Sequence, residues 1–151
     1  MRKFLIPLLV LILLGGFFGW RALHPKLTDQ EQLAANLDAI CAAARARSPR
    51  GIANFLAKDF KAGGMSKSEF QNSVAGGILQ YRVVDLKVSS VQSELNGQSA
   101  RSAGRFLLSL KSEFNSPPQV QGGKFNLQWR KIDGEWKITG ADVPDLGQLA
   151  N

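Results

Sequence analysis

The spacing of apolar residues divides the chain into three parts. Residues 4–20 carry no charged side chain. In the next part, apolar residues recur every three or four positions, which is the spacing of one helix face; they are Leu33, Leu37, Ile40, Cys41 and Ala44. From Tyr81 onward apolar and polar residues alternate, which is typical of strands with one buried face. Helices followed by strands predict an α+β domain.

Capping signals indicate where the helices begin. A serine or threonine followed by a glutamate three positions later forms a capping box, and Ser48 precedes a proline that suits the first helical position. The two boxes are Thr28 with Glu31 and Ser66 with Glu69. We expect three helices: one over about residues 29–46, a second from Ser48 through Phe55 and Leu56, and a third that ends at Gly76-Gly77.

The alternating half predicts two hairpins, the first around Asn96-Gly97. A two-residue loop there would set apolar residues of one strand against polar residues of the other, because a slip of one residue exchanges the two faces. We therefore expect a three-residue loop or one extra, bulged residue. The resulting pairs are Val84 with Leu110, Leu86 with Leu108, and Val88 with Phe106. Such a long hairpin should twist strongly.

The second hairpin turns at Asp133-Gly134, which suits a tight type I′ turn. The pairs that follow are Ile132 with Glu135, Trp129 with Ile138, and Leu127 with Gly140. One face then holds the two tryptophans of this stretch against the helices, while the other carries Arg130 and Lys137 toward water. The pattern favours an aromatic core over a base-stacking surface, which would expose aromatics among cations.

The uncharged start predicts a membrane segment. Residues 4–20 as a helix would span roughly 26 Å, close to the apolar thickness of a bilayer. Arg2 and Lys3 precede this run, and Trp20-Arg21 ends it with an interfacial aromatic and a cation. Good cleavage sites are lacking, so we expect an uncleaved anchor, with secretion after signal cleavage as the alternative. Residues 1–26 would form the anchor and linker, and 27–151 a periplasmic domain.

Charge and composition limit the chemistry. The chain has 151 residues and a formal charge of +7. Four of its 19 basic residues and none of its 12 acidic ones lie in residues 1–26, so the remainder is only mildly basic, which argues against nucleic acid as a partner. One cysteine, Cys41, and one histidine, His24, leave no disulfide and no cysteine- or histidine-based metal site in the domain. We expect no metal and no cofactor.

The order of these elements and the segment WRKIDGEWKITGADV resemble the nuclear transport factor 2-like superfamily, also described as cystatin-like cones. The resemblance covers residues 28–145. It implies three helices packed on a strongly curved antiparallel sheet of about four strands, with a pocket between the helices and the concave face. It further implies dimers through the sheet and, in some members, isomerase-like or dehydratase-like catalysis.

Two residues are candidates for such a pocket. An isomerase-like site needs a carboxylate and a hydrogen-bond donor in apolar surroundings. Tyr81 is the only tyrosine, and the expected register places Asp142 on the inner face. Dehydratase-like members rely on histidine, which the domain lacks. Tyr81 and Asp142 fit equally well as ordinary residues at strand ends.

The predicted anchor and the missing catalytic groups favour a non-catalytic protein-interaction or assembly module. Its partner would be another protein or a second copy, bound through the sheet. A small-molecule binder or an enzyme that uses the cone pocket is the alternative. Candidate contacts are Arg130 and Lys137 on the outer side of the hairpin, and an arginine cluster between the first two helices, Arg45, Arg47 and Arg50, which would suit an anionic partner.

Overall fold

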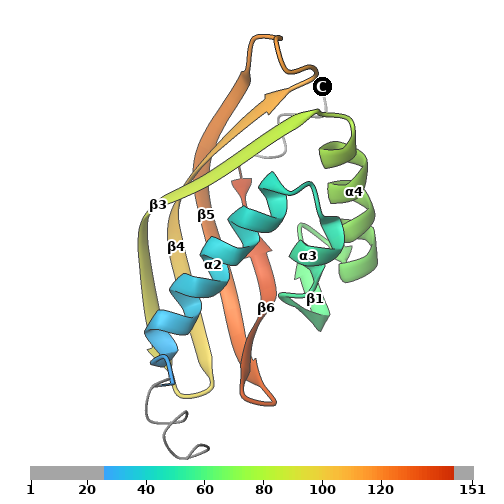
Figure 1. Ribbon diagram of the computed structural model, residues 1–151. Coiled ribbons are helices and arrows are strands. Elements are labelled where there is room, and N and C mark those ends of the chain that lie inside the picture. Colours follow the sequence, from blue (N-terminus) through green and yellow to red (C-terminus); the bar gives the residue numbers. More distant parts are fainter. Residues whose placement is uncertain (1–25, 145–151) are drawn as a thin grey trace, which may run out of the picture.

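The computed structural model describes residues 26–144. A curved, unclosed sheet of six strands forms one layer, and three helices lie against its concave side (Figure 1). Helix α2 runs diagonally across the sheet, while α3 and α4 lie to one side of it near strand β1. The expectation of an α+β domain with three helices on a curved sheet is confirmed in this part of the chain.

The helices begin at the predicted caps. Their bounds are Asp29–Arg45 for α2, Pro49–Ala53 for α3 and Lys67–Leu79 for α4. Thr28 and Ser66 both complete capping boxes. Two expected ends are wrong: α3 stops before Phe55, because the following residues pair as a strand, and α4 continues through Gly76-Gly77. A glycine in a helix interior costs only about 1 kcal/mol relative to alanine, so neighbouring residues can offset it.

The sheet has the strand order β2-β1-β6-β5-β4-β3. The strands are β1 (Leu56–Ala62), β2 (Met65–Ser66), β3 (Val83–Asn96), β4 (Ser99–Lys111), β5 (Gln119–Ile132) and β6 (Glu135–Asp142). All neighbours are antiparallel except β1 and β6, which are parallel. The expected antiparallel sheet of about four strands is therefore corrected to a mixed sheet of six. Residues 56–62 were missed because a short apolar run fits a helix face as well as a strand.

The first hairpin has the predicted register. Its pairs include Val84 with Leu110, Leu86 with Leu108, and Val88 with Phe106. Asn96 pairs with Ser99 at the turn, and the register shifts by one residue between Ser89 and Gln92. Ser90, within this shift, has a positive φ of 53°. Of the two alternatives, the extra bulged residue is therefore the one that occurs.

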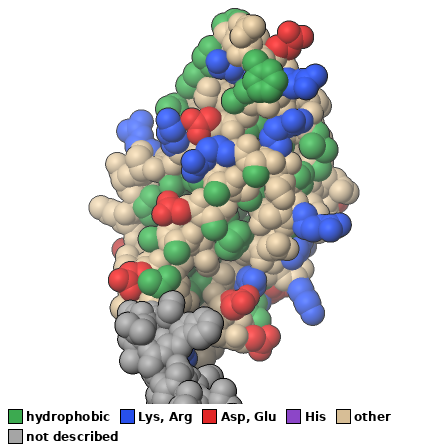
Figure 2. Space-filling model, in the orientation of Figure 1, with side chains coloured by type: hydrophobic (Ala, Val, Ile, Leu, Met, Phe, Trp, Pro, Cys, Tyr) green, Lys and Arg blue, Asp and Glu red, His purple; other side chains and the backbone are tan. Residues whose placement is uncertain are grey.

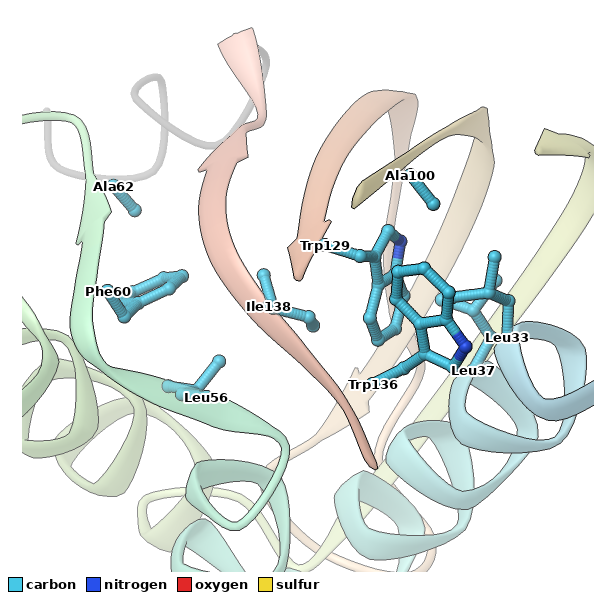
Figure 3. Close-up of a cluster of buried hydrophobic side chains, with 9 residues drawn as sticks. All are labelled: Leu33, Leu37, Leu56, Phe60, Ala62, Ala100, Trp129, Trp136 and Ile138. Atoms are coloured by element: carbon cyan, nitrogen blue, oxygen red, sulfur yellow. The ribbon is translucent and has the colours of Figure 1, made fainter. Parts of the chain in front are cut away.

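The main core lies between α2 and the sheet, and Figure 3 shows its side chains. It consists of Leu33 and Leu37 from α2, Leu56, Phe60 and Ala62 from β1, Ala100 from β4, Trp129 from β5, and Trp136 and Ile138 from β6. Both indoles lie between Ile138 and the α2 leucines, and each is only 2% exposed. The predicted aromatic core is confirmed.

The predicted anchor, residues 4–20, lies outside the described residues. Within residues 26–144, no helix is long and apolar enough to span a bilayer. The boundary between an anchor region of residues 1–26 and a domain of residues 27–151 therefore stays a prediction.

Candidate functional site

The space in which the resemblance places a pocket is filled by the core. Trp129 Nε1 donates a hydrogen bond to Ser102 Oγ at 3.0 Å, and Ser93 Oγ lies 2.7 Å from the same hydroxyl. Trp136 Nε1 donates to Asp29 Oδ1 on α2 at 3.0 Å. Both indoles are therefore held by hydrogen bonds as well as by packing, and they occupy the concave side between the sheet and α2 (Figure 3).

Asp29 joins the start of α2 to the second hairpin. Lys131 Nζ lies 2.6 Å from Asp29 Oδ1, the oxygen that also accepts the Trp136 indole, and 5.7 Å from the centroid of the Trp136 ring. The hydrogen bond from Lys131, and then that from Trp136, holds the pKa of Asp29 below its ordinary value of 3.8. These contacts join the start of α2 to the second hairpin. They engage the Asp29 carboxylate, so it is not free to act on a ligand in the cone.

Tyr81 and Asp142 do not come together. Tyr81 packs against a second, smaller apolar cluster with Ala44, Val84 and Leu110, near the C-terminal end of α2. Asp142 is exposed. It pairs with Asn126, which lies on the face of the sheet that is turned away from the core. The two candidates therefore form no shared catalytic site.

The expectation that Asp142 lies on the inner face is wrong, and a bulge in β6 is the reason. Near the turn the predicted pairs form, among them Ile132 with Glu135 and Trp129 with Ile138. The register then shifts, so that Gln128 pairs with Gly140 and Leu127 with Ala141 instead of Gly140. Thr139 is the extra residue, and every later residue of β6 changes face.

Arg130 and Lys137 lie on the outer side as predicted, but both are engaged within the domain. Arg130 Nη2 lies 2.8 Å from each carboxylate oxygen of Asp59 on β1. Lys137 Nζ donates to the carbonyl of Asn54 at 2.9 Å and lies 2.8 Å from Glu135. The hydrogen bonds from Arg130 and Lys137 lower the pKa of Asp59 and Glu135 respectively. Both cations therefore fasten the α3–β1 region to the hairpin.

The arginine cluster also has structural roles. Arg47 follows Ala46, the C-cap of α2, and has a φ of 54°. Its Nη2 donates to the carbonyl of Leu79 at 3.1 Å, which ties the end of α2 to α4. Arg45 Nε donates to the carbonyl of Cys41 at 3.3 Å and lies 3.9 Å from Asp85. Arg50 is exposed. Figure 2 shows basic side chains in several separate groups on this side of the molecule, rather than in one continuous patch.

A surface that sequence reasoning missed lies on the other side of the sheet. We define the outer face as the side of the sheet turned away from α2, and its centre on β4 and β5 carries Arg101, Arg105, Leu107, Val120 and Lys124. Leu107 and Val120 are 48% and 59% exposed. Leu107 lies across from Gly122, where an added Cβ would come within 3.4 Å of its Cδ1. The sequence did contain a signal for this surface. Leu107 and Val120 are apolar residues at positions where the alternating pattern predicts polar ones.

The hollows of the described surface include the following two. One, of about 470 Å³, lies on the outer face beside the β6 bulge, and its polar wall includes Lys61, Arg101, Gln128 and Asp142. The other, of about 320 Å³, lies between α2 and the turn of the second hairpin. Neither contains Tyr81, so neither joins the two pocket candidates.

Metal or thiol chemistry finds little support among residues 26–144. No group of three or more histidine, cysteine, aspartate or glutamate side chains in that range is arranged to hold a metal ion. Cys41 is buried, and burial raises the pKa of its thiol, which disfavours the reactive thiolate.

Comparison with known proteins identifies the fold. No protein-family model and no curated protein matches the sequence. A candidate scytalone dehydratase from Novosphingobium aromaticivorans superposes with a TM-score of 0.70 at 13% identity, over 76% of this chain and 82% of that chain. A protein of unknown function with a cystatin-like fold, from Nostoc punctiforme, gives 0.63 at 13%, over 79% and 93%. A nuclear transport factor 2-like superfamily protein from Salmonella enterica gives 0.65 at 13%, over 76% and 89%.

The fold is that of the nuclear transport factor 2-like proteins. The resemblance seen in the sequence is confirmed at this level. An identity of 13% shows the fold alone, because one fold carries many unrelated activities. The function of this domain must therefore be argued from its own core and surface.

Proposed function

We propose that the chain is a non-catalytic interaction module. A single-pass anchor formed by residues 4–20 holds the domain on the periplasmic side of a membrane, and the domain binds a protein partner through the outer face of its sheet. The observation that carries this proposal is the filled cone: Trp129 and Trp136 occupy the side of the sheet where a substrate would otherwise enter.

The positions of the candidate groups support binding over catalysis. General acid–base catalysis needs groups within hydrogen-bond reach of one substrate. Tyr81 and Asp142 lie on opposite faces of the sheet, and Asp29 is held by Lys131 and the Trp136 indole. Among residues 26–144, the two candidate groups are therefore apart and the two indoles fill the core beside α2, which gives a small-molecule site in the cone little support.

The outer face has the character of a docking surface. Leu107 and Val120 are exposed apolar side chains on neighbouring strands, near Gly122 and in a regular, paired part of the sheet. Protein interfaces commonly place such apolar contacts centrally and polar groups around them. Arg101, Arg105 and Lys124 provide a polar surround of this kind.

The test is in-cell crosslinking of the full-length chain, tagged at its C-terminus and expressed at its native level. After formaldehyde treatment, we expect the chain in the membrane fraction together with a reproducible adduct heavier than one chain. Leu107→Asp should reduce the adduct about tenfold or more, since it buries a charge in a contact that was apolar. Leu79→Asp is the matched control, because Leu79 is also exposed but lies at the end of α4.

Two results would count against the proposal. If no adduct forms, or if Leu107→Asp and Leu79→Asp behave alike, the outer face is not the binding surface. If the chain is recovered in a shortened, soluble form, residues 4–20 act as a cleaved signal and the anchor is excluded. Melting curves of both variants distinguish a lost contact from a lost fold.

A further inference from the structure

We infer that the outer face binds an acidic protein surface rather than a second copy of this chain. This inference rests on the proposed function, because it names the chemistry of the partner at the same surface. It is carried by the strand register, which determines which charges share the outer face.

The outward positions of β3, β4 and β5 are predominantly basic. The basic residues at these positions are Lys87, Arg101, Arg105, Lys111, Lys124 and Arg130, and the acidic ones are Asp85 and Glu94. Lys87 lies 3.3 Å from Asp85, and Arg130 lies 2.8 Å from Asp59. Arg101 and Arg105 form no ion pair with any residue in 26–144.

The centre of the face concentrates this charge around the apolar contacts. Arg105 lies directly opposite Lys124, and one step further along the same side Leu107 lies opposite Gly122. An anion placed over this part of the face would be attracted by Arg105, which forms no ion pair within residues 26–144. A partner with acidic side chains around an apolar contact would therefore complement both features of the surface.

A second copy complements this surface poorly. In a two-fold dimer the same patch occurs on both subunits, so the basic centre would lie against another basic centre. Juxtaposed like charges are a common means by which interfaces reject wrong partners. The family's expected dimer through the sheet is thus disfavoured here by the charge of the face itself.

The test is site-specific photo-crosslinking of the full-length chain in the cells that express it. Benzoylphenylalanine replaces Asn126, which is exposed and lies across from Ala103 on the outer face. The control carries it at Asn72, which is exposed on α4. Adducts are purified under denaturing conditions, and the crosslinked segment of the partner is sequenced by mass spectrometry.

We expect an adduct from Asn126, but not from Asn72, whose crosslinked segment is rich in aspartate and glutamate. Arg105→Glu should lower its yield about tenfold or more, because it sets like charges against each other. Lys58→Glu, which reverses the charge of an exposed residue on β1, should leave the yield unchanged, and Arg105→Lys should retain most of it. Melting temperatures of the variants show that each remains folded.

Three outcomes overturn the inference but remain compatible with an interaction module. The first is an Asn126 adduct between two copies of this chain, and the second is an adduct whose yield does not change in Arg105→Glu. The third is a crosslinked partner segment without acidic residues. An adduct with phospholipid overturns it in favour of an anionic membrane surface. If Asn126 gives no adduct at all, the inference and the proposed function fail together.

Discussion

A single hydroxyl holds the largest buried side chain of β5. Ser102 is fully buried, and its Oγ accepts the indole N–H of Trp129. Ser102→Ala would leave that donor without a partner in a site closed to water. We expect a loss of about 1–3 kcal/mol in the free energy of unfolding, which is the cost of a buried unsatisfied donor. Urea denaturation followed by tryptophan fluorescence measures it.

Ser93 supplies the control for this prediction. Its hydroxyl lies 2.7 Å from the Ser102 hydroxyl but is only partly buried, so water can replace it. Ser93→Ala should therefore cost clearly less than Ser102→Ala. Equal losses from the two substitutions would mean that the indole N–H does not depend on the Ser102 hydroxyl.

Asp29 makes the stability of the domain sensitive to acid. Its folded pKa lies below the ordinary value because Lys131 and then Trp136 donate to the carboxylate. The stabilisation is fully present above the unfolded pKa and is lost as pH falls through the lowered folded pKa, from about pH 5 downward. We therefore expect Asp29→Asn to lower the melting temperature at neutral pH. The difference from the natural chain should shrink on acidification, and a difference that stays constant with pH would contradict this assignment.

At the scale of elements, two bulges decide which residues face the core. The bulge at Ser90 brings the apolar sets of β3 and β4 into register, and the bulge at Thr139 moves Asp142 from the expected inner face to the outer face. Each adds one residue to one strand of an antiparallel pair. The first was one of two alternatives that the sequence indicated, because the apolar residues of the two strands define which faces must meet. The second could not be predicted, because Gly140 has no side chain and Ala141 is small, so neither marks a face.

Gly104 in β4 makes room for the buried ring of Phe125. A Cβ at Gly104 would lie 2.9 Å from Phe125 Cζ and 3.1 Å from the carbonyl oxygen of Ser89. We expect Gly104→Ala to destabilise the domain by about 1–3 kcal/mol, because the packed neighbours must shift. Thermal unfolding followed by circular dichroism gives the change.

Gly76 is the matched control for Gly104. It lies in the interior of α4, and a Cβ there would meet nothing within 4 Å. Gly76→Ala should therefore stabilise the domain by roughly 0.5–1 kcal/mol, since alanine restricts the unfolded chain and favours the helix. If both alanine variants destabilise alike, glycine is not needed at position 104 for the space it leaves.

At the scale of the molecule, local sequence patterns predicted the helices and the two hairpins. They did not predict strand pairing between segments that lie far apart in the sequence. The caps of α2 and α4 and the register near the turn of the second hairpin follow from neighbours in the sequence. Strand β1 depends on a parallel partner, β6, that lies far along the chain, and nothing within residues 56–62 distinguishes it from a helix. The prediction of a pocket was affected by the same omission, because Phe60 of β1 is part of the core that fills the cone.

The orientation of the chain in the membrane can be tested by labelling an introduced cysteine with a maleimide, because the natural cysteine should not react. Cys41 is 4% exposed, and burial raises the pKa of its thiol, so a maleimide should leave it unmodified in the folded domain. Asn72→Cys adds an exposed thiol on α4. Arg2, Lys3 and the amino terminus outnumber Arg21 and Lys26 across residues 4–20, which favours a cytoplasmic N-terminus.

We therefore expect a membrane-impermeant maleimide to label Asn72→Cys in intact spheroplasts, and to leave the natural chain unlabelled until it is unfolded. The reagent reaches only thiols outside the inner membrane, so labelling places the domain on the periplasmic side. Labelling of Asn72→Cys only after lysis would place the domain in the cytoplasm. It would also remove the periplasmic partner on which the outer-face proposal depends.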